Sequence, residues 1–277
     1  MLPTLFARCL IHVAATAALI ACPALALAQA TPAPSAAVQT VHVPYVRDPV
    51  DKSYRKMISG MQRFERERAL APDASLRFRL LPRLPKARMD GITLRVAGDS
   101  LSLPITLDNA LSFVLPPSEQ AIAQDAAVVA NRRSDSMTWR AWVQSPGLAP
   151  GTRRLGDLRL ECRVGMDAGL ISNTSKIFGW LTNMLTDTDR VCNTADGNYL
   201  FFAERPIFSV TLQSGQRREL LPFSLLYAGG QLDKESLPFC DCQVLLDRSY
   251  YAPLWDTSWP DDTIVSFVYM DDQGTAP

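Results

Sequence analysis

One stretch decides the fold class, and it reads Ile92-Thr-Leu-Arg-Val-Ala-Gly-Asp-Ser-Leu-Ser-Leu-Pro-Ile-Thr-Leu-Asp-Asn-Ala-Leu-Ser-Phe-Val-Leu115. Successive side chains of a strand point to opposite faces, so alternating apolar residues predict half-buried strands. Here the alternation falls into three runs, separated by Gly98-Asp99 and Asp108-Asn109, which predict turns. The alternating positions are Ile92, Leu94, Val96, Leu101, Leu103, Ile105, Leu107, Leu111, Phe113 and Leu115.

The same alternation recurs in seven further runs, which predict seven further strands. In the first of them, Arg77 and Arg79 are expected to point outward. The runs are Leu76–Leu80, Trp139–Val143, Leu158–Val164, Phe208–Leu212, Phe223–Leu225, Cys242–Leu246 and Val265–Tyr269.

Helical spacing of three and four residues appears in two places. One amphipathic helix is predicted to start at Asp51-Lys-Ser and to carry Tyr54, Met57, Ile58, Met61 and Phe64, and a second covers Asn173–Leu185. Ser118 is positioned to cap a short helix through Ala130. The whole pattern predicts a mainly β protein, an immunoglobulin-like or transthyretin-like β-sandwich with two short amphipathic helices.

A duplicated β-module is an open alternative within this fold class. A gap-free shift of 211 − 93 = 118 positions brings six identical residues into register. Each copy holds a Leu-Pro pair inside the strand pattern, where the missing N–H implies an edge or a bulge. The coinciding residues are Thr93, Leu94, Leu103, Pro104, Leu107 and Ala110 with Thr211, Leu212, Leu221, Pro222, Leu225 and Ala228.

The first residues have the layout of a signal peptide: Arg8, an apolar run over Cys9–Ile20, and Ala26-Leu27-Ala28 as a cleavage site. An alternative is a lipoprotein anchored through Cys22, because Leu19-Ile20-Ala21-Cys22 resembles a lipobox. Continued Ala/Leu sequence after that cysteine argues against the anchor. Either route places the protein in the periplasm or outer envelope of a bacterium.

We therefore divide the chain into five parts. Residues 1–28 are the signal peptide and 29–50 a flexible leader, because Thr31–Ala37 is rich in Pro, Ala and Ser. Residues 51–165 hold a helix and the first β-sandwich module, 166–197 a helical insertion, and 198–277 a second β module.

The charge balance excludes two classes of partner. The 28 basic and 28 acidic side chains give no general attraction to nucleic acid or to anionic lipid. After the signal segment, no apolar run approaches the ~20 residues that a transmembrane span needs.

Removal of the signal leaves four cysteines: Cys162, Cys192, Cys240 and Cys242. An even number in an exported chain predicts two disulfides, and four cysteines allow three pairings. A bond between Cys240 and Cys242 is strained, so we expect Cys162 and Cys192 each to pair with one of those two. A redox role for Cys240-Asp-Cys242 is disfavoured by the intervening carboxylate and by burial.

Gly98-Asp99-Ser100-Leu101 spells the signature of the GDSL esterases and lipases, and the resemblance implies a serine nucleophile. That family takes its base from an Asp-x-x-His near the C-terminus, but here His42 is the one histidine after the signal segment and lies far upstream. The tetrapeptide is therefore interpreted as a hairpin turn. The same scarcity of histidine argues against a zinc site, and we predict neither metal nor cofactor.

The loop Arg248–Asp262 interleaves aromatic rings with carboxylates. Sugars pack their apolar faces on aromatic rings while carboxylates hold their hydroxyls, so the loop is a candidate carbohydrate site. The alternative is structural, since Trp and Tyr often fill the ends of sandwiches and Asp is a common turn residue. The candidate residues are Tyr250, Tyr251, Trp255, Asp256, Trp259, Asp261 and Asp262.

These observations favour an exported, non-enzymatic binding or structural module whose partner is an envelope protein or a glycan. The alternative is a carbohydrate-binding or glycoside-acting protein that uses the Tyr250–Asp262 loop. No catalytic residue is assigned.

Overall fold

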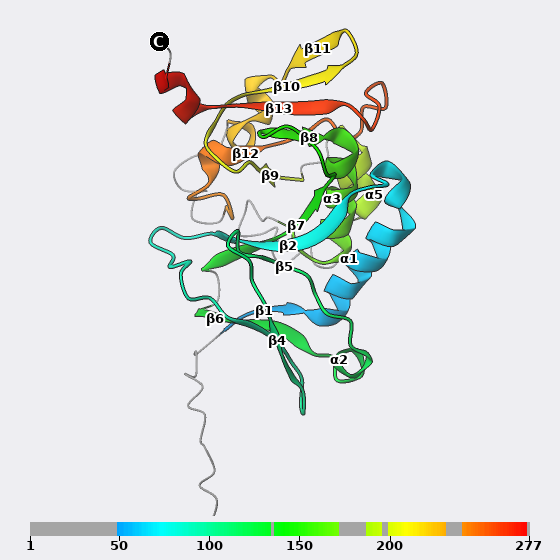
Figure 1. The fold of residues 1–277 in the computed structure, drawn as a ribbon, viewed down its shortest axis with the longest axis vertical. Coiled ribbons are helices and arrows are strands. Elements are labelled where there is room, and N and C mark those ends of the chain that lie inside the picture. Colours follow the sequence, from blue (N-terminus) through cyan, green and yellow to red (C-terminus); the bar gives the residue numbers. More distant parts are fainter. Residues whose placement is uncertain (1–48, 134–135, 172–186, 196–198, 231–239, 276–277) are drawn as a thin grey trace, which may run out of the picture. The chain divides into compact units, whose positions relative to one another are not determined.

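The computed structural model describes residues 49–133, 136–171, 187–195, 199–230 and 240–275. These residues form a mainly β protein with few helices, in which every strand pairing is antiparallel (Figure 1). The sequence prediction of a mainly β chain is confirmed. The predicted signal peptide 1–28, residues 29–48 of the predicted leader 29–50, and the predicted helix 173–185 lie outside the described residues, as do Cys22 and His42. The last two residues of the leader, 49 and 50, belong to the first strand.

The first sheet has the strand order β1-β6-β3-β4. Its strands are β1 (Pro49–Ser53), β6 (Ala127–Arg133), β3 (Leu94–Ala97) and β4 (Ser102–Ile105). The predicted hairpin is confirmed, with Leu94 opposite Ile105. In the second copy of the predicted duplication, Thr211 lies opposite Leu220. This pairing does not test the duplication, which stays a prediction.

The third alternating run of the 92–115 stretch forms β5 (Ser112–Phe113), which is not part of the first sheet. It belongs to a second sheet with the order β5-β2-β7. The turn between β4 and β5 lies at Asp108-Asn109, as predicted. The Asp108 carboxylate accepts the backbone N–H of Ala110 and of Ser112 at 2.9 and 2.8 Å. Leu111 within this turn has φ +55°, and the chain changes sheet there.

The second sheet contains β2 (Ser75–Pro82) and β7 (Met137–Gln144), which confirm two predicted strands. One face of this sheet shares a hydrophobic core with the first sheet. Phe78 and Leu80 from β2 and Trp139 from β7 meet Leu94, Val96 and Val128 there.

The other face of β2 and β7 carries polar side chains, and the alternation of the strands places Arg79, Arg140, Trp142 and Gln144 on it. Arg140 is buried. The expectation that Arg79 points into solvent is wrong, because its guanidinium lies 4.9 Å from the centre of the Trp142 ring.

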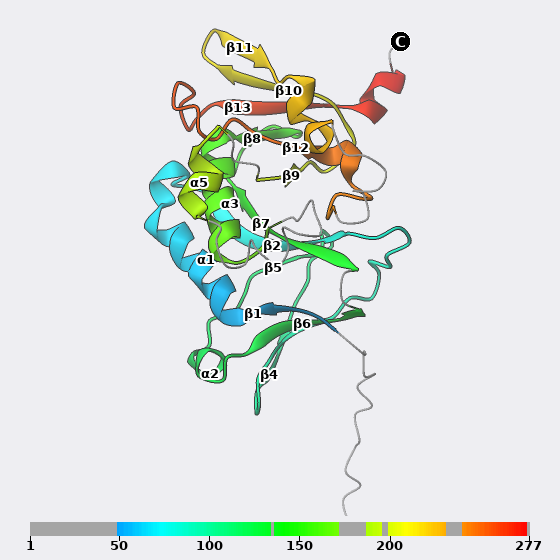
Figure 2. The ribbon, with the colours of Figure 1, turned by 180° about the vertical axis from the view of Figure 1, so that it is seen from behind.

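The third sheet has the order β11-β10-β13-β8, and a two-stranded ribbon β12-β9 lies beside it (Figures 1 and 2). The predicted strands at β10 and β13 are confirmed. All four residues of the edge strand β11 are exposed. The strands are β11 (Arg217–Leu220), β10 (Ile207–Ser214), β13 (Ile264–Tyr269), β8 (Thr152–Arg154), β12 (Ser249–Tyr250) and β9 (Phe201–Phe202).

Two helices begin at serine caps. Ser53 accepts from the Lys56 N–H at the start of α1 (Tyr54–Arg66), three residues later than predicted because β1 precedes it. Ser118 caps α2 (Glu119–Ala123) as expected, but this helix does not reach Ala130. Asp125 follows it with φ +47°, and β6 then begins.

The predicted strand Leu158–Val164 is wrong, since this segment belongs to helix α3 (Leu155–Asp167). This helix packs against α1, β7, β8 and α5 (Thr188–Asn193). A helix that is covered on all sides keeps no amphipathic stripe, so its apolar residues alternate by chance. The strands predicted at Phe223–Leu225 and Cys242–Leu246 are also wrong. The first is the 3-10 helix η2 (Phe223–Leu225), and the second is a turn leading into η5 (Leu246–Arg248).

The remaining short 3-10 helices connect the larger elements. They are η1 (Arg68–Leu70), η3 (Tyr227–Gly229) and η6 (Met270–Thr275). No helix within the described ranges is both long and apolar enough to cross a bilayer.

All four cysteines form disulfides, but the predicted pairing is wrong. Cys162 on α3 bonds to Cys192 on α5, with Cα atoms 5.9 Å apart, and Cys240 bonds to Cys242 at 4.9 Å. The helices α3 and α5 pack together, whereas Cys240 and Cys242 lie in a separate apolar cluster with Leu200, Phe202 and Leu245. The two disulfides fit an exported or envelope protein.

Candidate binding site

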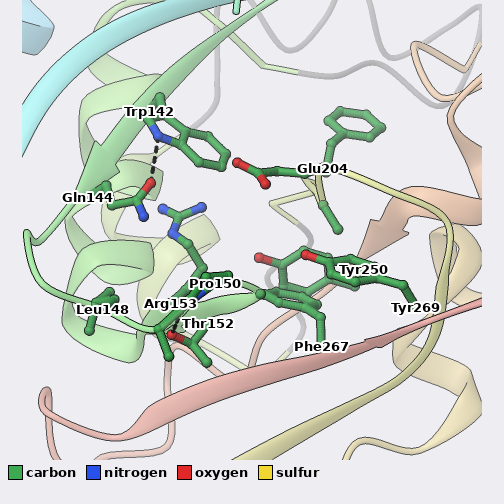
Figure 3. Close-up of a pocket in the computed structure, with 14 residues that line it drawn as sticks. Trp142, Gln144, Leu148, Pro150, Thr152, Arg153, Glu204, Tyr250, Phe267 and Tyr269 are labelled. Carbon is green, nitrogen blue, oxygen red and sulfur yellow. Dashed lines mark hydrogen bonds between the residues drawn. The ribbon is translucent and has the colours of Figure 1, made fainter. Parts of the chain in front are cut away.

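A recess, here called the aromatic pocket, lies between the polar face of β7 and strands β9, β12 and β13 (Figure 3). Its cavity volume is about 170 Å³. Five aromatic rings and two charged side chains line it: Trp142, Phe202, Tyr250, Phe267 and Tyr269, with Arg153 and Glu204.

The strand pattern explains how these rings meet. Trp142 and Gln144 are two residues apart on β7, and the Trp142 indole N–H donates to the Gln144 side-chain oxygen at 3.0 Å. Phe267 and Tyr269 share one face of β13, with ring centres 6.1 Å apart. The Tyr250 ring from β12 meets Phe267 edge-on at 5.1 Å. The walls of the aromatic pocket are therefore formed by aromatic rings that pack on one another and are held by β-strands.

Arg153 carries a buried positive charge at this wall. Its guanidinium donates to the Glu161 carboxylate at 2.7 Å and to the Val143 carbonyl at 2.6 Å. Burial works against the charged form, but the Glu161 carboxylate and the other acidic groups nearby together outweigh it, so the net effect raises the Arg153 pKa. The guanidinium also lies 4.2 Å from the centre of the Trp142 ring, a cation–π distance.

Arg79 contacts the same indole from β2 and is less well compensated. Its side chain makes no hydrogen bond or ion pair with any described residue, and burial lowers its pKa. The nearby negative charges of Glu204 and Glu161 act in the opposite direction and only partly restore it. Trp142 is thus in contact with two cationic side chains.

Glu204 follows β9 at the rim. Figure 3 shows its carboxylate and the Arg153 guanidinium directed toward the same space. Among the described residues this carboxylate has no ion-pair or hydrogen-bond partner, and it is exposed. Opposite charges therefore face one another across the aromatic pocket without contact.

Two further polar atoms at the wall lack partners in the described part of the chain: Arg153 Nε and the Tyr250 hydroxyl. Tyr250 is fully buried, and burial raises its pKa, so it is a neutral hydrogen-bond donor at physiological pH. An unpaired buried donor costs about 1–3 kcal/mol. Each such group needs an explanation, and a bound water, ion or ligand group that supplies the missing hydrogen bond is one.

Thr152 carries the one aliphatic hydroxyl among the described residues that line the aromatic pocket. These lining residues include no Ser, Cys or His, and the Thr152 hydroxyl donates to the Ala149 carbonyl at 2.6 Å. A nucleophile needs a base within hydrogen-bond reach. No such pair occurs among the described residues that line the aromatic pocket.

The structure separates the residues of the predicted carbohydrate loop. Tyr250 lines the aromatic pocket, and Tyr251 is half-buried. Trp259 is buried under the Arg217 guanidinium, which lies 3.6 Å from its ring centre. Trp255 is 44% exposed.

Trp255, Trp259 and Asp261 line a second, more open recess of about 400 Å³, here called the Trp255 groove, with Arg159 and Arg163. Asp256 is half-buried, and hydrogen bonds from Ser258 lower its pKa. Asp262 is exposed and lines neither recess.

Arg159 from α3 explains the shape of this loop. It donates to the backbone carbonyls of Leu254, Asp256 and Trp259 at 2.8–3.0 Å and to the Asp261 carboxylate. Asp261 is therefore engaged in a structural ion pair. The sequence prediction missed Arg159 because the segment was assigned to a strand.

Ser100 lies in the turn between β3 and β4, as the hairpin interpretation predicts. Its hydroxyl accepts the Gln124 side-chain amide at 2.7 Å, and the Gln124 oxygen accepts the Ser100 N–H at 3.1 Å. An amide is no general base.

The described cysteine and acidic side chains form no cluster of three or more suited to a metal ion. Comparison of the chain with family models, with curated proteins and with solved structures finds no match. The site therefore has to be interpreted from its own geometry.

Proposed function

We propose that the protein is an exported, non-enzymatic binding module of a bacterial cell envelope, and that its ligand enters the aromatic pocket. One observation carries the proposal: Arg153 and Glu204 face the same ring-walled space without forming an ion pair. Ligand sites are typically concave and apolar, with a few polar groups that orient the ligand.

The cavity volume limits what binds there. Drug-sized ligands occupy pockets of ~300–1,000 Å³, whereas this one measures about 170 Å³. The aromatic pocket is suited to one residue or one end of a larger ligand. A partner that is an envelope glycan or protein would insert such an end.

The finer fold class and the compartment belong to the same proposal. The shared core between the first two sheets supports an immunoglobulin-like or transthyretin-like β-sandwich. The two disulfides support export to the periplasm or outer envelope by the signal peptide 1–28, with lipid anchoring at Cys22 as the alternative.

The test is capture of ligands from an envelope extract by the immobilised full chain, with identification by mass spectrometry. Ala149 is exposed at the rim, so Ala149→Trp places a large side chain there without disturbing a buried residue. We expect wild type to retain a ligand and Ala149→Trp to lose it, while Trp255→Ala retains it. Equal retention by wild type and Ala149→Trp would contradict the proposal.

A second candidate is carbohydrate binding at the Trp255 groove. The observation that favours it is the 44% exposure of Trp255 beside a recess of about 400 Å³. An exposed indole face offers a stacking surface for a sugar. In the same capture experiment, this candidate predicts loss of ligand in Trp255→Ala and retention in Ala149→Trp.

A further inference from the structure

We infer that the ligand group entering the aromatic pocket is a single uncharged sugar residue. This inference rests on the proposed function and names the class of ligand. Three features of the aromatic pocket carry it: balanced charge, hydrogen-bonding groups of both kinds, and ring-lined walls.

The charges around the aromatic pocket argue against a ligand group that carries a net charge. The Arg153 guanidinium is already neutralised by Glu161 at 2.7 Å, and both side chains are at most 5% exposed. Across the cavity, Glu204 is the acidic group that most favours the charged form of Arg79. The charges of Arg79, Arg153, Glu161 and Glu204 therefore sum to zero, and a ligand with a net charge would leave the aromatic pocket with an unbalanced charge.

The hydrogen-bonding groups call for a ligand that both donates and accepts. Arg153 and the Gln144 amide supply donors, and the Glu204 carboxylate accepts. A hydroxyl group does both, and a pyranose carries several hydroxyls around one ring. A purely apolar ligand would cover the Glu204 carboxylate and the unpaired Arg153 Nε without offering either a hydrogen-bond partner, at a cost in free energy.

The walls supply the remaining contacts. The apolar C–H faces of a pyranose pack on aromatic rings, and Trp142, Phe267 and Tyr269 offer three of them. Arg79 and Arg153 both contact the Trp142 indole, at 4.9 and 4.2 Å from its ring centre, and so fix the orientation of this wall. A wall that is already ordered loses little entropy when the ligand binds.

Three related sugars test the inference: glucose, glucosamine and glucuronate. Each charged analogue differs from glucose at one position, with an ammonium group at C2 in glucosamine and a carboxylate at C6 in glucuronate. Each sugar is titrated into the full chain, and binding is followed by ligand-detected NMR and calorimetry. We expect glucose to bind and both charged analogues to bind at least tenfold more weakly. Ala149→Trp should abolish glucose binding, and Glu204→Ala should weaken it by about tenfold through loss of a charged acceptor. Trp255→Ala should bind like wild type.

The contrary outcomes are distinct. Tighter binding of glucosamine or glucuronate than of glucose would overturn the inference, as would glucose binding that only Trp255→Ala abolishes. A tripeptide that contains glutamine tests an alternative uncharged ligand in the same assay. If it displaces glucose, or binds when glucose does not, the preferred ligand group is an amide side chain and not a sugar. If no sugar binds while the envelope ligand is still lost in Ala149→Trp, the inference fails and the proposed function stands. Circular dichroism of each variant confirms folding.

Discussion

Arg153 and Glu161 form an ion pair in the interior, with 2.7 Å between Nη2 and Oε2 and exposures of 5% and 4%. The pair joins β8 to α3, and the Glu161 carboxylate also accepts the Val143 N–H from β7 at 3.0 Å. Three elements therefore depend on one carboxylate.

Substitution Glu161→Gln should leave the Arg153 charge buried without a counter-ion. Breaking one partner of a buried pair costs about 3–5 kcal/mol. We expect a corresponding loss in the free energy of unfolding, measured with urea. Asp90→Asn removes the exposed pair with Arg88 and serves as the control, with an unchanged urea midpoint. Equal midpoints for wild type and Glu161→Gln would show that the pair is not needed.

The two disulfides should contribute unequally to stability. Their sequence separations are 30 and 2 residues. Loop-closure entropy predicts a cost of about 3.5 kcal/mol for removing Cys162–Cys192 and about 1.5 kcal/mol for Cys240–Cys242. Paired Cys→Ala variants, unfolded in urea under identical conditions, measure both values. A larger loss from the Cys240–Cys242 pair would contradict the loop-closure account.

Alkaline pH should destabilise the protein through its buried tyrosines. Burial raises the pKa of Tyr199 to about 12, against an ordinary 10.0. Between these two values the unfolded chain loses the proton while the folded chain keeps it, so stability is complete below pH 10 and falls as the pH rises toward 12. The loss for this side chain amounts to about 3 kcal/mol.

The matched variant for this pH effect is Tyr199→Phe, which deletes a buried hydroxyl that has no partner among the described residues. We expect its urea midpoint to equal or exceed that of wild type at pH 8 and to fall less by pH 11. Burial raises the pKa of Tyr250 too, so part of the pH dependence should persist until Tyr250→Phe is added. A variant with the same pH dependence as wild type would show that Tyr199 does not contribute.

Ser100 should be inert toward a fluorophosphonate probe, despite its GDSL surroundings. Its hydroxyl bonds to the amide of Gln124, which cannot remove a proton. Labelling is followed by mass spectrometry with Ser100→Ala as the blank, and the two proteins should be indistinguishable. Stoichiometric labelling of wild type alone would restore the esterase hypothesis.

The features that the sequence predicts best are turns and helix caps, which depend on neighbouring residues. The β3–β4 hairpin and the cap at Ser118 depend on residues within a few positions, and each lies where its signal predicts. Helix α3 was missed because contacts on every side replace the polar stripe of an ordinary surface helix. Side-chain periodicity then carries no information about the element.

The candidate site was missed for a related reason. The aromatic pocket gathers Trp142, Arg153, Glu204, Tyr250 and Phe267 from five separate segments, and only Tyr250 was a candidate from sequence. The one available signal was the pair Arg140 and Trp142 within an apolar strand, because large polar side chains on one face of a buried strand need partners. Which partners they find depends on the pairing of distant strands.

The edge strand β11, which pairs with β10 on one side, has a consequence for how copies of this protein behave when crowded. Its sequence Arg217-Arg-Glu-Leu220 presents charged side chains along an open row of backbone hydrogen-bonding groups. Charges at a sheet margin make strand addition from a neighbouring molecule unfavourable, because their hydration would be lost. The charged edge strand thus disfavours the association of copies into fibres, whatever ligand the aromatic pocket binds.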